Sequence, residues 1–332
     1  MLRLPKFQYV APCSVEEACS LLQEYEGEIK VIAGGTDLLP SMKQRLFTPK
    51  YILDLKRIPG LNQIGERADG EITIGSLTTL TTLENSPVIK SYFLGLAQAV
   101  DSVAATQVKN MGTIGGNIAL DTRCLYFNQS HLWRKSFEPC LKRGGNVCHV
   151  VKGGEKCYAY FAADTVPVLI ALGAKVTINN SKGERQCDLP SLYTQDGKAP
   201  NTLKPGEVIT EIAIPVPKEK SGNTYKKLRL RGAIDFSLIG VAVNLTMEDG
   251  VCKTIKVVLG AVGSGPIVVE SAEKLLQGTS VTEALIEEAG TLARKAAKPV
   301  ANTGTSPGYR RDMAALLTKM CLREALTKAK VS

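Results

Sequence analysis

The 332-residue sequence lacks several features that would place it in a familiar class. It has no run of about 18 apolar residues, so no segment is expected to span a membrane. It has no Gly-x-Gly-x-x-Gly after a first strand, which disfavours a Rossmann site, and no pair of Cys-x2-4-Cys knuckles of the kind that usually hold zinc. What is present, 44% hydrophobic residues and a mean hydropathy of 0.00, is typical of a globular protein with a sizeable core.

Charge and cysteine usage narrow the expected compartment and partners. No secretory signal peptide is recognised at the start, and nine cysteines is an odd count, so we expect a reducing, cytoplasmic compartment. The net charge is +9, but apart from one loop the basic residues are scattered and form no nucleic-acid motif. We therefore expect an acidic protein partner and no nucleic acid. The two histidines, His131 and His149, are left without a role.

Four of the nine cysteines fall within residues 122–161. Cys124, Cys140, Cys148 and Cys157 have the spacing Cys-x15-Cys-x7-Cys-x8-Cys, and the proline and glycine pairs between them let a loop fold back on itself. The same stretch holds seven of the 18 aromatic residues, and seven basic residues against two acidic ones. Thiolates, apolar cover and positive charge together suit an iron–sulfur cluster, which carries net negative charge.

Other interpretations of the four cysteines stay open on spacing alone. Free cysteine is among the most buried residue types, so the four could be small core residues, although their clustering argues against this. Disulfides are disfavoured by the odd count and the expected reducing compartment. Zinc remains an alternative that the spacing places only slightly behind an iron–sulfur cluster.

Two glycine-rich loops predict that an extended anionic ligand binds. The first, Gly34-Gly35-Thr36, follows a predicted strand at 29–33 and precedes a helical turn, so its backbone amides can face an anion. The second includes Gly112, Gly115 and Gly116. One such loop is more often only a turn, but a ligand with a pyrophosphate in its middle needs several close backbone approaches, and glycine permits them.

The order of predicted elements indicates two domains of the α+β class. Residues 1–222 alternate short strands and helices, begin with a small subdomain at about 1–60, and are interrupted by the cysteine-rich insertion at about 122–161. Residues 217–223 have linker composition. Residues 223–332 give strands followed by helices, which predicts an antiparallel sheet with helices on one face.

Several segments resemble a known family. Ala33-Gly34-Gly35-Thr36-Asp37-Leu38, Thr113-Ile114-Gly115-Gly116-Asn117, the Asp164 segment before Gly173-Ala174-Lys175, and Tyr225-Lys226 with Asp235-Phe236 are similar to FAD-binding medium (β) subunits of the molybdenum hydroxylase, or xanthine dehydrogenase, family. The resemblance covers nearly the whole chain. It implies a two-subdomain FAD-binding domain of the PCMH / vanillyl-alcohol-oxidase type, followed by an α+β C-terminal domain.

The insertion resembles one branch of that family. In most members the Gly-Gly-Asn loop runs almost directly into the Asp164 segment. Here Asp121-Thr122-Arg123-Cys124 and Tyr126-Phe127-Asn128-Gln129-Ser130 are similar to the 4-hydroxybenzoyl-CoA reductases, whose flavin subunit carries an extra [4Fe-4S] cluster. This resemblance implies a cluster in place of zinc.

The resemblance also implies which residues hold the two cofactors. The two glycine loops would hold the FAD pyrophosphate and ribose, Asp164 the ribityl or isoalloxazine side, and Lys226 would lie near the flavin ring. Structural roles stay open for Asp164 as a helix cap, for Lys226 as a solvated residue and for Tyr309 at a helix start. The expected FAD-binding set is Ala33, Gly34, Gly35, Thr36, Asp37, Leu38, Thr113, Gly115, Gly116, Asn117, Asp164 and Lys226, and the expected cluster ligands are Cys124, Cys140, Cys148 and Cys157.

By resemblance, the chain is an oxidoreductase subunit with no catalytic residue of its own. A large partner subunit would hold molybdopterin and remove the phenolic hydroxyl of 4-hydroxybenzoyl-CoA in anaerobic aromatic degradation, and a small one would hold two [2Fe-2S] clusters. Ferredoxin is the expected electron donor and a dimer of heterotrimers the expected assembly. Two alternatives are the FAD subunit of another molybdenum hydroxylase that oxidises its substrate, and a zinc-stabilised binding protein without redox activity.

Overall fold

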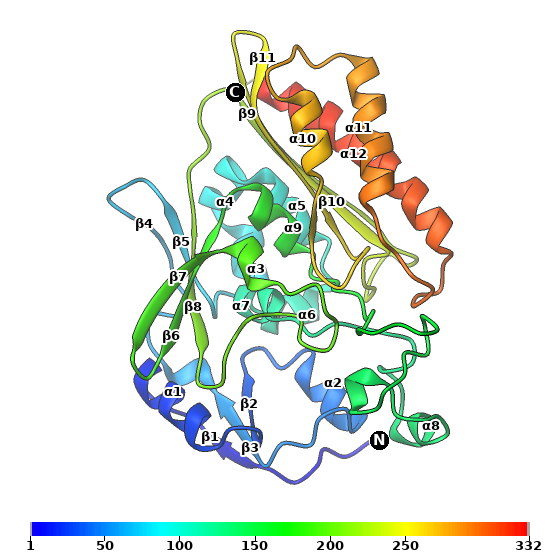
Figure 1. Cartoon of the computed structure of the whole chain (residues 1–332). Helices are drawn as coiled ribbons and strands as arrows, with labels where there is room; N and C mark the ends of the chain where they lie inside the picture. Colours follow the sequence, from blue (N-terminus) through cyan, green and yellow to red (C-terminus); the bar gives the residue numbers. More distant parts are fainter. Residues whose placement is uncertain (1, 331–332) are drawn as a thin grey trace.

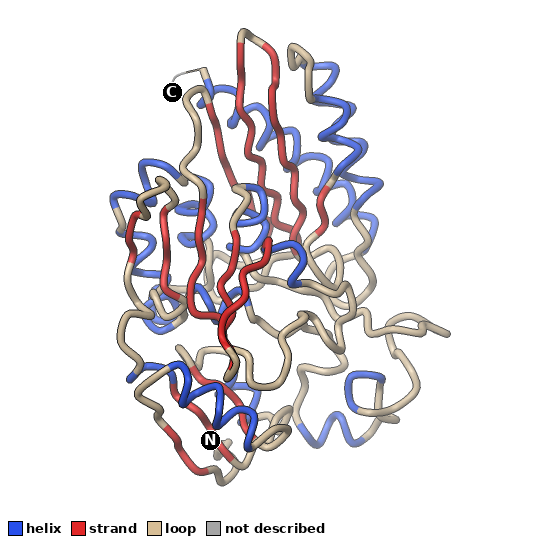
Figure 2. Tube along the Cα trace, turned by 60° about the vertical axis from the view of Figure 1, so that its left-hand side comes forward, coloured by secondary structure: helices blue, strands red, loops and turns tan. Residues whose placement is uncertain are grey.

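The computed structural model describes residues 2–330, which form three β-sheets arranged from the N-terminal to the C-terminal end of the molecule (Figures 1 and 2). The first is a small parallel sheet in the order β1 (Gln8–Val10), β3 (Tyr51–Asp54), β2 (Ile29–Ile32). Helix α1 (Val15–Glu24) connects β1 to β2, α2 (Leu38–Lys43) lies between β2 and β3, and the 3-10 turn η1 (Leu55–Arg57) follows β3. Helix α1 is capped by Ser14, whose hydroxyl accepts the Glu17 N–H, while the Glu17 carboxylate accepts the Cys13 N–H.

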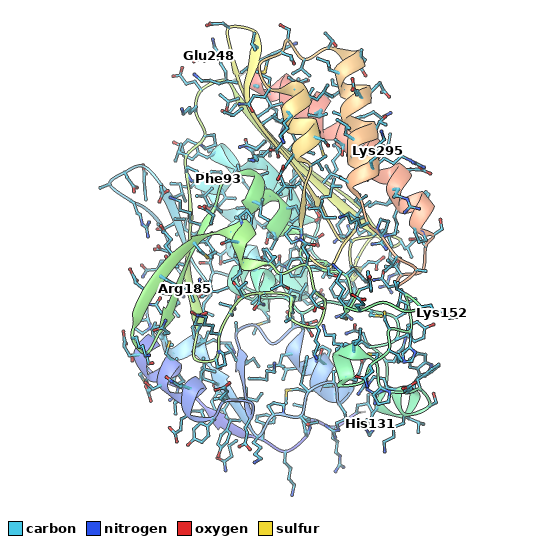
Figure 3. The ribbon with its side chains drawn as sticks, viewed as in Figure 1. Phe93, His131, Lys152, Arg185, Glu248 and Lys295 are labelled. Carbon is cyan, nitrogen blue, oxygen red and sulfur yellow. The ribbon has the colours of Figure 1, made fainter. Side chains whose placement is uncertain are left out.

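The middle sheet is antiparallel and has five strands. Its order is β4 (Ile64–Glu66), β5 (Ile72–Gly75), β8 (Val208–Ile214), β6 (Lys175–Asn180), β7 (Gly183–Asp188). Between β5 and β6 the chain forms α3 (Leu80–Asn85), α4 (Pro87–Tyr92), α5 (Leu94–Asp101), α6 (Thr106–Met111), α7 (Ile114–Ile118), the insertion and α9 (Thr165–Ala171), and η3 (Leu189–Leu192) follows β7. Apolar residues of these helices and strands form the largest core, and Phe93 is one of its fully buried members (Figure 3).

The C-terminal sheet is antiparallel in the order β12 (Ile267–Val268), β11 (Val251–Gly260), β10 (Ile239–Glu248), β9 (Ser221–Leu228). The helices that follow it, α10 (Glu270–Leu276), α11 (Glu283–Ala296) and α12 (Pro307–Ala329), cover one face. Helices α5 and α9 of the preceding domain pack on the other face, so the sheet is buried on both sides. The predicted α+β class is confirmed, and β9 begins inside the stretch that has linker composition.

Helix α12 anchors the C-terminal sheet through a buried arginine. The Arg310 guanidinium is fully buried and donates to the carbonyl oxygens of Leu238 and Ala261, and burial lowers its pKa to about 10. It also lies 5.7 Å from the ring centroid of Tyr160. The side chain of the neighbouring Tyr309 is exposed, and its backbone N–H donates to the Ser306 hydroxyl that caps α12. None of the helices within residues 2–330 is long and apolar enough to cross a membrane.

The cysteine-rich insertion is closed at its base by a pair of backbone hydrogen bonds. Arg123 and Tyr160 exchange N–H to carbonyl bonds of 2.8 Å each, so the chain leaves and returns at one point. Within it lie α8 (His131–Lys135) and η2 (Leu141–Arg143). The insertion packs beside α2 (Figure 1). The buried Arg134 guanidinium holds it there by donating to the Gln44 and Arg45 carbonyls at the end of that helix. His131 and Lys152 lie on its outer surface (Figure 3).

Candidate functional site

A cavity of about 740 Å³ lies between the N-terminal subdomain and the helices of the middle sheet. This volume is within the usual range for small-molecule and cofactor sites. Both glycine loops form its wall, and so do Arg123 and Lys142 of the insertion segment and Ile234, Asp235 and Phe236 from the C-terminal domain. Every residue of the expected FAD-binding set lines the cavity except Lys226.

The first glycine loop lines this cavity and holds three backbone amides that have no acceptor in the part of the chain that the structure describes. Gly35 has a φ of +72°, a left-handed conformation that suits glycine, and this turn carries the chain from β2 into α2. Within the described chain, the N–H groups of Gly35, Thr36 and Asp37 donate no hydrogen bond to a protein group. Consecutive unpaired amides are a cradle for an anion such as a phosphate.

The second glycine loop packs directly against the first. A Cβ on Gly34 would lie 1.9 Å from the Met111 carbonyl oxygen, so the two loops can touch only because Gly34 has no side chain. Thr113 caps α7 by accepting the Gly116 N–H at 3.1 Å. The Asn117 amide oxygen accepts from the Thr165 hydroxyl at 2.7 Å, while its amide nitrogen donates to no protein group among residues 2–330. The paired loops therefore fit an extended ligand with anionic groups.

Asp37 is held at the cavity wall by the base of the insertion. Its carboxylate lies 3.1 Å from the Arg123 guanidinium, which in turn lies 4.0 Å from the ring centroid of Phe236. Burial raises the pKa of Asp37, and the nearby Arg123 opposes that rise. Arg123 thus connects the first glycine loop with the C-terminal domain.

Asp164 lies in the cavity wall, but its carboxylate is engaged by the C-terminal domain. It accepts from the Tyr225 hydroxyl at 2.8 Å and from the Ser237 hydroxyl, and it pairs with Lys227 at 2.7 Å. Burial and the adjacent carboxylate raise the pKa of Tyr225 well above its usual value. The side chain does not cap α9, so the helix-cap interpretation is wrong. Its contact with a flavin stays a prediction.

Lys226 is not at the cavity, which corrects the sequence-based expectation. Its ammonium lies 2.6 Å from Glu324 of α12, on the opposite face of β9 from Lys227. Successive residues of a strand point to opposite faces, so Tyr225 and Lys227 share the face that meets Asp164 while Lys226 meets α12. This alternation is the signal by which Lys227 could have been found from the sequence.

We expect the Lys226–Glu324 pair to stabilise the fold in a pH-dependent way. Burial favours the neutral acid, but Lys226 and Gln98 outweigh it and lower the pKa of Glu324 to about 2. A carboxyl whose pKa is lower in the folded state stabilises it above its unfolded pKa, and this contribution fades as pH falls toward the folded value. Glu324→Gln should lower the free energy of unfolding by about 1–3 kcal/mol at pH 7.

Urea denaturation of both proteins over a range of pH checks this. The difference should narrow from about pH 5 downward, whereas Glu283→Gln, which removes an exposed pair with Arg323, should change little. An equal difference at pH 7 and pH 3 would contradict the assignment.

A second, smaller cavity lies inside the insertion and is lined by all four expected ligands, Cys124, Cys140, Cys148 and Cys157. Apolar side chains complete its wall, among them Phe127 and Val147. Burial raises the pKa of Cys124, and it raises the pKa of Cys157 to about 11. The other five cysteines lie elsewhere: Cys19, Cys252 and Cys321 are buried, Cys187 is half-buried, and Cys13 is exposed.

The side chains that line the small cavity do not form a ready-made metal site. No group of three or more His, Cys, Asp or Glu side chains within residues 2–330 could hold a single ion. Four thiolates bound to one zinc ion at 2.3 Å lie about 4 Å apart, whereas thiolates around a cubane are held farther apart by the cluster between them. The cluster therefore stays a proposal at this point. His149 lines the same cavity, and its Nε2 is 2.7 Å from the Glu138 carbonyl oxygen.

The two cavities adjoin. Phe127 and Lys142 line both of them, and the Lys142 ammonium lies 4.9 Å from the centroid of the Phe127 ring. The sequence did not single out either residue, because nothing in their spacing shows that they would form a common wall. The two adjoining cavities indicate a class of protein that holds an extended anionic ligand beside a cluster of cysteines.

Comparison with known proteins identifies the family. The model for the FAD binding domain in molybdopterin dehydrogenase matches residues 5–217, and that for the CO dehydrogenase flavoprotein C-terminal domain matches residues 223–325. The carbon monoxide dehydrogenase medium chain of Afipia carboxidovorans is 30% identical over 326 residues, covering 98% of each chain. The nicotinate dehydrogenase FAD-subunit of Eubacterium barkeri is 29% identical over 284 residues, 85% of this chain and 83% of that one.

Solved structures agree. A carbon monoxide dehydrogenase chain from Hydrogenophaga pseudoflava superposes with a TM-score of 0.82 at 27% identity, covering 98% of this chain and 99% of that one. The chain therefore belongs to the FAD-binding subunits of the molybdopterin dehydrogenase family, and it is an oxidoreductase subunit that binds FAD. The alternative of a binding protein without redox activity is wrong. The narrower resemblance to 4-hydroxybenzoyl-CoA reductase is not shown by these matches.

Proposed function

We propose that this chain carries FAD in the large cavity and a [4Fe-4S] cluster on Cys124, Cys140, Cys148 and Cys157, and that it transfers electrons within a molybdenum-dependent complex. The observation that carries this proposal is that all four cysteines line one cavity that shares a wall with the FAD cavity. FAD links one-electron and two-electron chemistry, and a cluster on four thiolates supplies one-electron steps.

The residues around the cysteine cavity suit a cluster. Phe127, Val147 and Ala159 give it an apolar wall that limits water, and the Val151 N–H lies 3.4 Å from the Cys148 sulfur. A protein changes the reduction potential of a cluster partly through hydrogen bonds to the sulfurs and partly by excluding solvent. The buried Lys142 adds positive charge beside the thiolates.

We infer that the complex works reductively on 4-hydroxybenzoyl-CoA, as the insertion sequence suggests. Two electrons and two protons would convert that substrate to benzoyl-CoA and water, with the electrons supplied by a low-potential ferredoxin. The chemistry would take place on a molybdopterin-binding large subunit, and a small subunit with two [2Fe-2S] clusters would relay electrons, in a dimer of heterotrimers. Names such as "medium chain" and "FAD-subunit" among the relatives support a multi-subunit assembly.

A second candidate function is favoured by those same relatives. They are named as dehydrogenases of carbon monoxide and nicotinate, so in this second interpretation the chain receives electrons from a substrate that its complex oxidises, and these names support it better than they support the reductive reaction. Supplying the purified complex with reduced ferredoxin and 4-hydroxybenzoyl-CoA separates the two. Release of benzoyl-CoA supports the reductive reaction. No turnover with this substrate, together with oxidation of a nitrogen heteroaromatic such as nicotinate in the presence of an electron acceptor, would favour the second candidate.

Removing the insertion should separate electron input from flavin binding. Because Arg123 and Tyr160 are already hydrogen-bonded, a short glycine turn can join them, and the amides of Gly35 to Asp37 lie outside the deleted segment. We expect the variant to keep FAD, its partner subunits and reduction by an artificial dye, but to lose reduction by ferredoxin. Stopped-flow flavin bleaching measures both rates.

Cys148→Ser is the matched control for this deletion, since it keeps the insertion and removes one expected ligand. It should lose ferredoxin-dependent reduction in the same way. Reduction of the deletion variant by ferredoxin at the parental rate would show that electrons do not pass through the insertion. Complete loss of FAD would show that the insertion is structural.

A further inference from the structure

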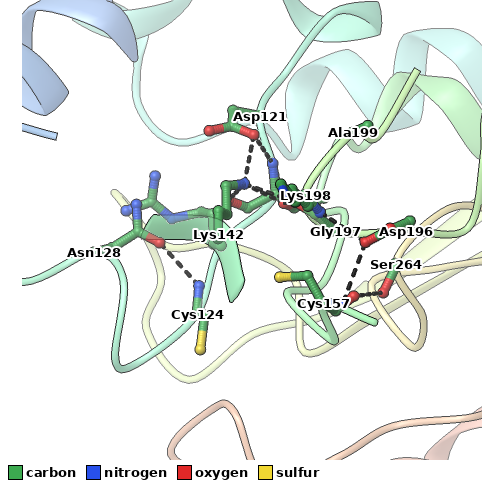
Figure 4. A network of polar contacts seen from close by, with 12 residues as sticks. Asp121, Cys124, Asn128, Lys142, Cys157, Asp196, Gly197, Lys198, Ala199 and Ser264 are labelled. Carbon is green, nitrogen blue, oxygen red and sulfur yellow. Dashed lines mark hydrogen bonds and ion pairs between the residues drawn. The ribbon is translucent and has the colours of Figure 1, made fainter. Parts of the chain in front are cut away.

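Lys142 is the point at which the insertion meets the flavin cavity. It follows Cys140 by two positions, in η2, and its side chain is only 6% exposed. Its ammonium lies 2.6 Å from the Asp121 carboxylate, 2.9 Å from the Gly197 carbonyl oxygen and 3.1 Å from that of Thr122, and it also contacts the Thr122 hydroxyl (Figure 4). Three segments of the chain are thus joined by one buried cation.

No other cation among residues 2–330 occupies this position. Arg123, Lys30 and Lys198 line the large cavity but not the cysteine cavity. Lys227 lines neither and is neutralised by Asp164. Lys156 is near Cys157 in the sequence but is exposed, so solvent and salt screen its charge.

The pair formed by Lys142 and Asp121 is oriented. Lys142 lines both cavities, whereas Asp121 lines only the large one, so the positive end of the pair faces the cysteines. Burying an ammonium costs several kcal/mol unless it is paired and hydrogen-bonded, and here four oxygen atoms compensate for that cost. A neutral side chain could link the same segments at a lower desolvation cost, which points to a role for the charge itself.

We propose that Lys142 is a positioning residue for electron transfer, whose buried charge raises the reduction potential of the cluster and so sets how electrons divide between cluster and FAD. The inference rests on the proposed function. When bound there, the cluster would pass single electrons from a low-potential iron–sulfur carrier to the flavin, whose full reduction would take two electrons and two protons, while Lys142 holds a positive charge in the common wall. A cation in the common wall stabilises the more negative, reduced cluster, and burial keeps it from being screened.

Redox titration of the parent, Lys142→Met, Asp121→Asn and Lys156→Met, following cluster and flavin spectra, tests the proposal. Lys142→Met should shift the equilibrium between reduced and oxidised cluster at least tenfold toward the oxidised form, about 59 mV for one electron. Asp121→Asn, which keeps the lysine and removes the opposing charge, should shift it in the other direction. Lys156→Met should stay close to the parent.

Each other outcome has a definite meaning. The role of Lys142 would be overturned if the cluster potentials of Lys142→Met and Asp121→Asn differed from the parent by no more than that of Lys156→Met. It would also be overturned if Lys142→Met and Asp121→Asn shifted the potential in the same direction, because a purely structural link predicts the same perturbation for both. If Lys142→Met fails to retain iron, the test is the direction in which Asp121→Asn shifts the cluster potential: an upward shift supports the role of Lys142, and a downward shift or none overturns it. A parent protein without any cluster would instead refute the proposed function.

Discussion

Replacement of Cys148 by serine is expected to remove most of the iron from the protein. Cys148 lines the small cavity together with Cys124, Cys140 and Cys157, and a serine hydroxyl is a much poorer ligand of cluster iron than a thiolate. Replacing a residue that only orients a metal ligand lowers metal affinity by about 10- to 100-fold, so replacing a ligand itself should reduce bound iron by at least about tenfold. Iron analysis and the visible spectrum of the anaerobically purified variant measure this.

Two other cysteines provide matched controls. Cys187 is half-buried, as Cys140 and Cys148 are, and Cys13 is exposed, but neither lines the cavity. Cys187→Ser and Cys13→Ser should therefore keep parental iron. Cys19, Cys252 and Cys321 should also keep it, although a hydroxyl in an apolar core is expected to cost stability. If Cys187→Ser lost as much iron as Cys148→Ser, the four-cysteine assignment would be wrong.

Replacement of Gly116 by valine is expected to abolish stoichiometric FAD binding. Within 4 Å a Cβ at Gly116 meets only the Thr113 hydroxyl, at 3.0 Å, so this hydroxyl has to shift by a few tenths of an ångström but no backbone atom blocks the side chain. The branched group would keep the pyrophosphate from the loop backbone. We expect affinity to fall more than about tenfold, equivalent to at least about 1.4 kcal/mol. Flavin fluorescence after release from purified protein measures occupancy.

Gly35→Val should also lose FAD, but here two sources of strain in the loop itself act together. Its φ of +72° is strained for valine, and a Cβ there would meet Ile32 at 3.0 Å. Gly304→Val is the matched control, since the nearest heavy atom to its Cβ is in Leu230 at 3.8 Å and the position is exposed. Full FAD in Gly116→Val would place the pyrophosphate elsewhere.

Local sequence patterns predicted the parts of the fold and site that depend on local rules. The predicted strand at 29–33 is β2, and the helical turn expected after the first glycine loop is α2. Glycine pairs predicted the two loops of the large cavity, because close backbone approach and left-handed turns require glycine. The clustering of four cysteines predicted that they would line one cavity.

Tertiary packing decided the rest. The sequence placed Lys226 at the flavin, but the alternation of β9 directs Lys227 toward Asp164 and Lys226 toward Glu324 of α12. The contact of Arg134 with the end of α2, 89 and 90 residues away in the sequence, and the common wall formed by Phe127 and Lys142 depend on how the insertion folds back. No periodicity or spacing in the sequence encodes the contacts of Arg134, Phe127 and Lys142.

The most direct test of the central claim is the content of flavin and iron in the chain purified anaerobically without its partner subunits. A chain that carries both cofactors should contain one FAD and four irons, with flavin bands and a broad shoulder near about 400 nm that bleaches on reduction. Stoichiometric FAD with no iron, or with zinc in place of iron, would contradict the account.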